Sequence, residues 1–183
     1  MKKIIIGVFL MMSVAVLCGC SLMKGMTPKD KVREFLDSYK NQDQDVIDNL
    51  EEIVSSEYKG DYKDRYKNIM INQYKNLDYK ITDEIIDGNN ALVTAEITVF
   101  DYGTAISDAD EYLTTHEKEF YKETDEKELD DDKFLEYKLD LLEKVTDKKT
   151  YTIEFSLNRE DKDWKLDSLS DTDIEKIHGI YKE

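Results

Sequence analysis

Residues 91–100, ALVTAEITVF, carry an apolar side chain at every odd position. Successive side chains of a strand point to opposite faces, so this period of two predicts a strand with one buried face. Shorter alternations at 77–81 and 164–166, and a second long one at 150–157, predict three further strands. The apolar residues of the two long stretches are Ala91, Val93, Ala95, Ile97 and Val99, then Tyr151, Ile153, Phe155 and Leu157.

Turn residues join these strands in pairs. Asp87-Gly88-Asn89-Asn90 separates the first two, and its residues tolerate the positive φ that a tight hairpin turn requires. Glu160-Asp161-Lys162-Asp163 separates the last two. We therefore expect two antiparallel hairpins.

Helical periodicity precedes and follows the strands. Thr27 as N-cap, Pro28 in the first turn and Asp30 predict the start of a first helix. A second helix is expected around 46–54, a third around 58–70 with an interruption near Gly60, and a last one after Ser170 or Asp171. The apolar residues at helical spacing are Val32, Phe35, Leu36 and Tyr39; Val46, Ile47, Leu50, Ile53 and Val54; Tyr58, Tyr62, Tyr66, Ile69 and Met70; and Ile174, Ile177, His178 and Tyr181.

Residues 104–147 lie between the two hairpins and are predicted to form a helical insert. Two helices are expected, separated by an acidic run from Asp125 to Asp132 that we interpret as a solvated tip. The resulting order of elements lacks the regular alternation of a parallel α/β sheet. The predicted fold class is α+β, with an antiparallel sheet packed on N-terminal helices.

The first 20 residues resemble a lipoprotein export signal. Lys2-Lys3 precede a 14-residue apolar run from Ile4 to Leu17, shorter than the roughly 20 residues of a membrane-spanning helix. Leu17-Cys18-Gly19-Cys20 resembles the bacterial lipobox, which implies diacylglyceryl transfer to Cys20 and cleavage after Gly19. The sequence thus predicts a signal peptide at 1–19, lipidated Cys20 with a short tether at 20–26, and one domain at 27–183, outside the cytoplasm and anchored to the bacterial membrane by lipid.

The composition excludes some partners and linkages. Residues 1–19 hold two of the 26 Lys and Arg and none of the 42 Asp and Glu, which leaves a net charge of −18 on the rest. Such a surface repels a phosphate backbone, so we exclude nucleic-acid binding. After cleavage Cys20 would be the single cysteine, so the domain is expected to have no disulfide.

Three segments together resemble the nuclear transport factor 2-like (cystatin-like, SnoaL-like) domains of bacterial lipoproteins. They are PKDKVREFLDSYKNQD, YKITDEIIDGNNALVTAEITV and YTIEFSLNREDKDWKLDSL. The resemblance implies a strongly curved sheet wrapped around the first helix, forming a cone with an apolar pocket. Under that reading the aromatic residues expected to line the pocket are Phe35, Tyr39, Tyr62, Tyr66 and Trp164. The insert departs from the commonest form of this fold, and could cover the pocket or form a separate contact surface.

Enzymes of that fold, such as ketosteroid isomerases and scytalone dehydratases, use a pocket acid or His with a Tyr donor. His116 and His178 are far apart in sequence, and neither belongs to a catalytic motif. No nucleophile motif is present either. We predict no catalytic residues and no cofactor.

Metal binding is also disfavoured. One pattern of oxygen ligands, Asn41, Asp43, Asp45 and Glu52, matches a calcium loop, but Val46 occupies the position that requires Gly. Two distant His residues and no available Cys make a zinc site impractical. We therefore predict no metal.

These observations favour a non-catalytic binding or scaffold module with an unknown protein or apolar small-molecule partner. Two alternatives stay open. One is a small pocket enzyme that transfers protons on an apolar molecule, and the other is a structural component of an envelope complex.

Overall fold

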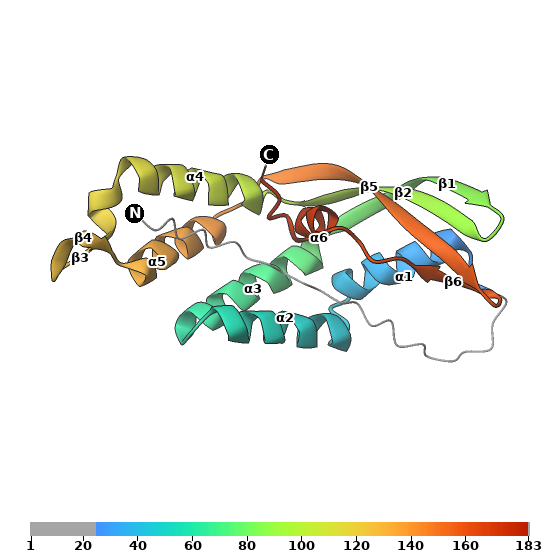
Figure 1. Ribbon diagram of the computed structural model, residues 1–183, viewed down its shortest axis with the longest axis horizontal. Helices are drawn as coiled ribbons and strands as arrows, with labels where there is room; N and C mark the ends of the chain where they lie inside the picture. Colours follow the sequence, from blue (N-terminus) through green and yellow to red (C-terminus); the bar gives the residue numbers. More distant parts are fainter. Residues whose placement is uncertain (1–24, 183) are drawn as a thin grey trace.

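The computed structural model describes residues 25–182, with the backbone alone at 125–127. The predicted signal peptide, Cys20 and most of the tether lie outside the described residues. The elements, shown in Figure 1, are α1 (Pro28–Lys40), α2 (Gln44–Glu57), α3 (Asp61–Asn76), β1 (Asp78–Asp87), β2 (Asn90–Phe100), α4 (Tyr102–Thr115), the 3-10 helix η1 (Glu117–Phe120), β3 (Tyr121–Lys122), β4 (Asp125–Leu129), α5 (Asp131–Leu142), β5 (Lys148–Glu160), β6 (Asp163–Leu166) and α6 (Asp171–His178).

The main sheet has four antiparallel strands in the order β1-β2-β5-β6. Both predicted hairpins are confirmed. Gly88 in the β1–β2 turn has φ 60°, and Asp161 in the β5–β6 turn has φ 56°. Gly and Asp tolerate this left-handed region, which two-residue hairpin turns require. The α+β class with an antiparallel sheet is confirmed.

The two long strands, β2 and β5, pair over the whole length of β2. The pairing runs from Asn90 opposite Asn158 to Phe100 opposite Lys148 without a register shift. Directly opposed residues share one face, so the two apolar alternations form one continuous inward surface. Its central members Val93, Ala95 and Ile97 are 0% exposed.

Helices cover that inward face. In Figure 1, α1 to α3 lie on one side of the sheet, and α1 contacts β1, β2 and β6. The Phe35 ring on α1 lies 6.1 Å from the Phe155 ring on β5, in an edge-to-face contact. Burial of these apolar surfaces is the main favourable term for the fold. On the opposite face Thr98 and Thr150 join through their hydroxyls at 2.8 Å.

The third helix begins later than the sequence suggested. Gly60 has φ 55° and is the N-cap of α3, while Tyr58 ends α2 as its C-cap. Tyr58 therefore precedes α3, although its ring stacks on Tyr66 with centroids 4.6 Å apart. The helical spacing of the tyrosines reflects this contact across a helix break.

The insert is more structured than two helices and a charged tip. Phe120 lies on η1, and residues 121–129 form the small hairpin β3–β4. The acidic run Asp125–Asp132 is not an irregular connection between two helices. The first part of the run is strand β4, and the Asp130 side chain accepts a hydrogen bond from Lys133 N as the N-cap of α5. Asp131 and Asp132 then occupy the first turn of α5, where acidic side chains favour the helix dipole.

Trp164 provides a test of the sheet assignment. Its side chain is 7% exposed, belongs to the main core and lies beneath the Arg159 guanidinium at 5.7 Å. Trp164→Ala should lower the free energy of unfolding by about 3 to 5 kcal/mol, because it leaves a cavity. Urea unfolding followed by circular dichroism measures this loss, with Trp164→Phe as the control that retains most of the packing. A loss for the Ala variant no larger than that of the Phe control would show that the Trp164 ring is not part of the core.

Candidate functional site

The five aromatic residues expected to line a pocket lie in two parts of the interior. Phe35, Tyr39 and Trp164 belong to the main core, while Tyr62 packs on a second cluster around Ile69, Tyr102, Leu139 and Leu142. Tyr66 contacts both clusters, and burial raises its pKa to about 12. They pack on other aromatic and aliphatic side chains. Their role in lining a ligand pocket stays a prediction.

His178 is buried in the core. Its side chain is on α6, 3% exposed, with Nε2 3.4 Å from the Tyr74 hydroxyl and its ring 5.9 Å from the Tyr39 ring. Burial lowers the pKa of His178 to about 4 and raises that of Tyr39 to about 12. The imidazole is therefore neutral at pH 7. A neutral His held among tyrosine rings serves packing and polar satisfaction in this arrangement.

The other histidine, His116, is exposed at the end of α4. Its ring stacks on Tyr112 with centroids 4.0 Å apart and planes 8° apart. Tyr112 in turn stacks on Tyr137 of α5 at 5.0 Å, and the Tyr112 hydroxyl donates to Glu119 at 3.0 Å. These contacts join the two helices of the insert. His116 and His178 thus belong to different parts of the fold.

The calcium-like pattern is divided between two helices. Asn41 is the C-cap of α1 and Asp43 is the N-cap of α2. Asp45 and Glu52 both lie within α2. Val46 is 7% exposed and packs in the core, as its apolar character suggested. Across residues 25–182, no three His, Cys, Asp or Glu side chains are grouped so that they could hold a metal ion.

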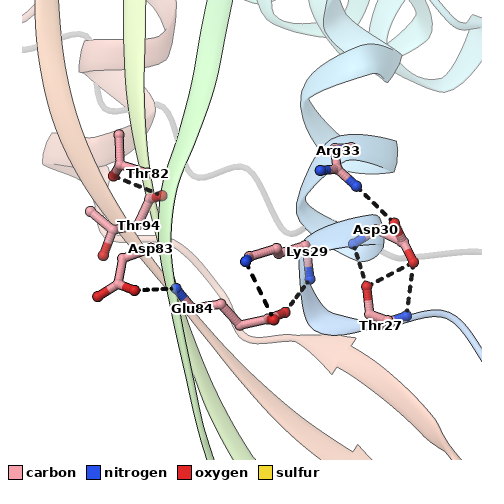
Figure 2. A network of polar contacts seen from close by, with 8 residues as sticks. All are labelled: Thr27, Lys29, Asp30, Arg33, Thr82, Asp83, Glu84 and Thr94. Carbon is pink, nitrogen blue, oxygen red and sulfur yellow. Dashed lines mark hydrogen bonds and ion pairs between the residues drawn. The ribbon is translucent and has the colours of Figure 1, made fainter.

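The start of α1 is tied to the edge strand β1 by a polar network, which Figure 2 shows. Thr27 and Asp30 form a reciprocal capping box, and the hydrogen bond from Thr27 lowers the pKa of Asp30. The next free helix amide, Lys29 N, donates to the Glu84 carboxylate of β1 at 3.0 Å. Lys29 Nζ also lies 3.6 Å from Glu84. The beginning of the described chain is thereby fixed beside one end of the sheet.

A β-bulge on β1 lies in the same network. Thr82 is the extra residue, and its hydroxyl donates to the Thr94 carbonyl at 3.2 Å. The Asp83 carboxylate accepts from Glu84 N at 2.8 Å. Polar side chains thus satisfy backbone groups along this edge, a common way of protecting an edge strand from pairing.

The insert is joined firmly to the rest of the fold. Arg65 on α3 donates from Nε to Glu143 at 2.7 Å and from a terminal nitrogen to Asp140 at 2.7 Å, both beside or on α5. These hydrogen bonds raise the pKa of Arg65. At the start of α4, Gly103 N donates to Gly179 O at 2.8 Å, and a Cβ at position 103 would lie 1.9 Å from Tyr181 O. Close backbone contact at Gly103 holds α4 against the C-terminal segment.

The insert also carries most of the net charge of the chain. Residues 104–147 contain 16 Asp and Glu and 6 Lys, a net charge of −10 out of −16 for the whole protein. Glu111, Glu123 and Glu136 are among its exposed acids. Together with exposed His116, which stacks on the half-buried Tyr112, these acids make the insert the candidate contact surface. Sequence periodicity indicated the insert but not its hairpin.

Comparison with known proteins gives little further information. No protein family model and no curated protein matches the chain. Among solved structures it is similar to a candidate lipoprotein, ycdA, from Bacillus subtilis subsp. subtilis str. 168, with 16% sequence identity and a TM-score of 0.42. The similarity covers 88% of this chain and 49% of that one, so the chain spans about half the length of this neighbour.

The low pKa of His178 predicts a pH dependence of stability. As the pH falls from about 6.5 to about 4, the unfolded chain takes up a proton at His178 that the folded chain does not, so folding weakens. Between pH 7 and pH 5 this site should account for a loss of about 2 kcal/mol.

The measurement is urea unfolding at both pH values for the wild type and for His178→Gln, which keeps a polar side chain. The Asp and Glu carboxylates make the same contribution to the pH dependence of unfolding in both proteins. The variant should therefore lose less stability on acidification, and an identical loss would show that His178 is accessible to protons in the native state.

Proposed function

We propose that the protein is a lipoprotein outside the cytoplasm, anchored through Cys20, whose domain acts as a non-catalytic binding or scaffold module. The observation that carries the anchor is Leu17-Cys18-Gly19-Cys20 at the end of the 14-residue apolar run 4–17, which follows Lys2-Lys3. Two or three acyl chains on one cysteine give stable anchoring, since each buried CH2 contributes about 0.8 kcal/mol. No helix within residues 25–182 is long and apolar enough to cross a bilayer.

The topology supports a division of roles between the two ends of the sheet. In Figure 1, the insert lies at the left, and the β1–β2 and β5–β6 turns lie at the right. The described chain starts at the turn end, where a Cβ on Gly25 would lie 3.5 Å from Lys162 O. An anchor at Cys20 would hold this end near the membrane and present the acidic insert away from it. We assign the partner-binding surface to the insert, with a basic protein as its partner.

The fold supports a nuclear transport factor 2-like domain in its order of elements and in the packing of α1 against one face of an antiparallel sheet. We also propose that the domain has the conical pocket of that family. Its ligand would be an apolar small molecule.

One observation favours the enzyme alternative. The Tyr79 hydroxyl on β1 donates to Asp37 on α1 at 2.7 Å, and burial together with this hydrogen bond raises the pKa of Tyr79 to about 12. A tyrosine donor beside a carboxylate is the pairing that proton transfer would require. We prefer a structural role, because the pair joins α1 to β1 and both side chains are only partly buried. The third alternative is a structural part of an envelope complex. It would use the same anchor and the same insert surface as the proposed binding module.

Substitution at the two cysteines tests the anchor. Cys20→Ala should abolish incorporation of labelled palmitate and leave an uncleaved precursor, because it removes the acceptor sulfur. Cys18→Ala is the matched control and should be processed normally, since it keeps a small residue two positions ahead of the acceptor. Equal labelling of the Cys20 variant would refute lipidation at this residue.

Neutralising the insert tests the partner surface. We compare two triple variants, each purified from its native membrane with the proteins bound to it. The insert variant is Glu111→Gln, Glu123→Gln and Glu136→Gln, and the control of equal charge change is Glu52→Gln, Glu57→Gln and Glu154→Gln. Exposed charges contribute little to stability, so both should fold as the wild type does. The insert variant should lose bound protein several-fold while the control retains it, and retention by both would remove the insert from the binding surface.

A further inference from the structure

The exposed apolar side chains of the described residues gather at one end of the fold. Met26, Ile85 and Ile86 are the large apolar residues found exposed within 25–182, at 38%, 57% and 53%. Ile85 and Ile86 are on β1, three and two positions before Gly88 in the turn. Met26 directly precedes Thr27, which lies two residues from the Lys29–Glu84 contact (Figure 2). Single exposed apolar residues are ordinary, but their grouping at one end indicates a contact.

The two isoleucines lie on a strand that pairs on one side only among residues 25–182. β1 is an edge strand of the sheet. Ile85 lies opposite Leu92 on the open face, and Ile86 lies opposite Ala91 on the face that the helices cover further along. The apolar surface therefore extends around both sides of the edge. A rigid protein docked on one face would cover one isoleucine, whereas a fluid surface can contact both.

The chain length before Gly25 restricts what lies nearby. Gly25 lies beside the β5–β6 turn, next to Lys162 O. Gly25 is five positions after Cys20, and a fully extended chain of that length spans at most about 18 Å. If Cys20 carries acyl chains in a bilayer, Gly25 lies within that distance of the membrane surface, and the adjoining β5–β6 turn lies close to it. The short tether raises the effective concentration of the membrane, so even a weak contact becomes populated.

We propose that the outer edge of β1 at Ile85 and Ile86, together with Met26, rests in the interface of the same bilayer that holds Cys20. The inference rests on the proposed lipidation of Cys20. The contact is shallow, because Asp83 and Asp87 flank the isoleucines and their carboxylates stay among the lipid headgroups. The edge contact would complement the acyl anchor and restrict the rotation of the domain about its tether.

The test uses the lipidated protein in phosphatidylcholine vesicles. Cleavage removes Cys18 and the thioether blocks Cys20, so an introduced cysteine is the single free thiol. Ile86→Cys carries an environment-sensitive fluorophore, and Glu123→Cys in the β3–β4 turn is the matched control. A headgroup nitroxide lipid should quench the label at 86 at least about twofold more than the label at 123, as expected of an interfacial group. Met26→Cys serves as a second reporter outside any element, should the change on β1 impair folding.

The outcomes separate this contact from the anchor. Flotation of the protein with vesicles and labelling with palmitate report the anchor independently. A protein that floats, with equal quenching at 86 and 123, overturns the membrane contact alone. A protein that neither carries an acyl group nor floats overturns the anchor and the contact together. Disulfide-linked dimers of unlabelled Ile86→Cys on the vesicles, with no quenching of the labelled form, would assign the edge to a second copy and overturn the proposal.

Discussion

The pairing of β2 with β5 is the constraint on which the rest of the structure depends. It joins strands whose nearest ends, Phe100 and Lys148, are separated by the whole insert. Closing a segment of this length costs chain entropy, which the continuous inward surface of the two strands must offset. The same pairing aligns their apolar residues on one face, where α1 packs. A slip of one residue would turn the apolar face of β5 to solvent.

This pairing also gives the domain two different ends. Because β2 and β5 are antiparallel, the insert leaves and re-enters the sheet at the end marked by Phe100 and Lys148. The two hairpin turns must lie at the opposite end, and the Lys29–Glu84 contact fixes the start of α1 there. The contacts of Arg65 and Gly103 fix the insert against the rest of the fold. The insert and the hairpin turns are therefore held at opposite ends of the sheet. This arrangement is compatible with the proposed anchor at one end and the proposed binding surface at the other.

Much of the fold could be predicted because its signals are local. The capping box at Thr27, the turn at Gly88 and the period of two in β2 each follow from neighbouring residues. The hairpin β3–β4 could not, because its strands are short, charged and without alternation. In the sequence Asp130 is one of several acids in a run, and only the folded structure shows that its side chain caps α5. The contacts of Arg65 with α5 join residues 75 or more positions apart, and no pattern in the sequence marks them. For the candidate sites, the resemblance of Leu17-Cys18-Gly19-Cys20 to a lipobox is a local pattern, and lipidation of Cys20 stays a prediction. Ile85-Ile86 interrupts the alternation of β1, a signal that one apolar side chain must lie on each face.

The orientation of the anchored domain is tested most directly by energy transfer to the bilayer. A donor is placed on Lys162→Cys in the β5–β6 turn or on Glu123→Cys in the insert of the lipidated protein, and acceptors are placed on the headgroups. Transfer should be strong from position 162 and much weaker from position 123, because the turn end faces the membrane in the proposed orientation. Equal transfer from the two positions, or stronger transfer from 123, would contradict an orientation with the insert directed away from the bilayer.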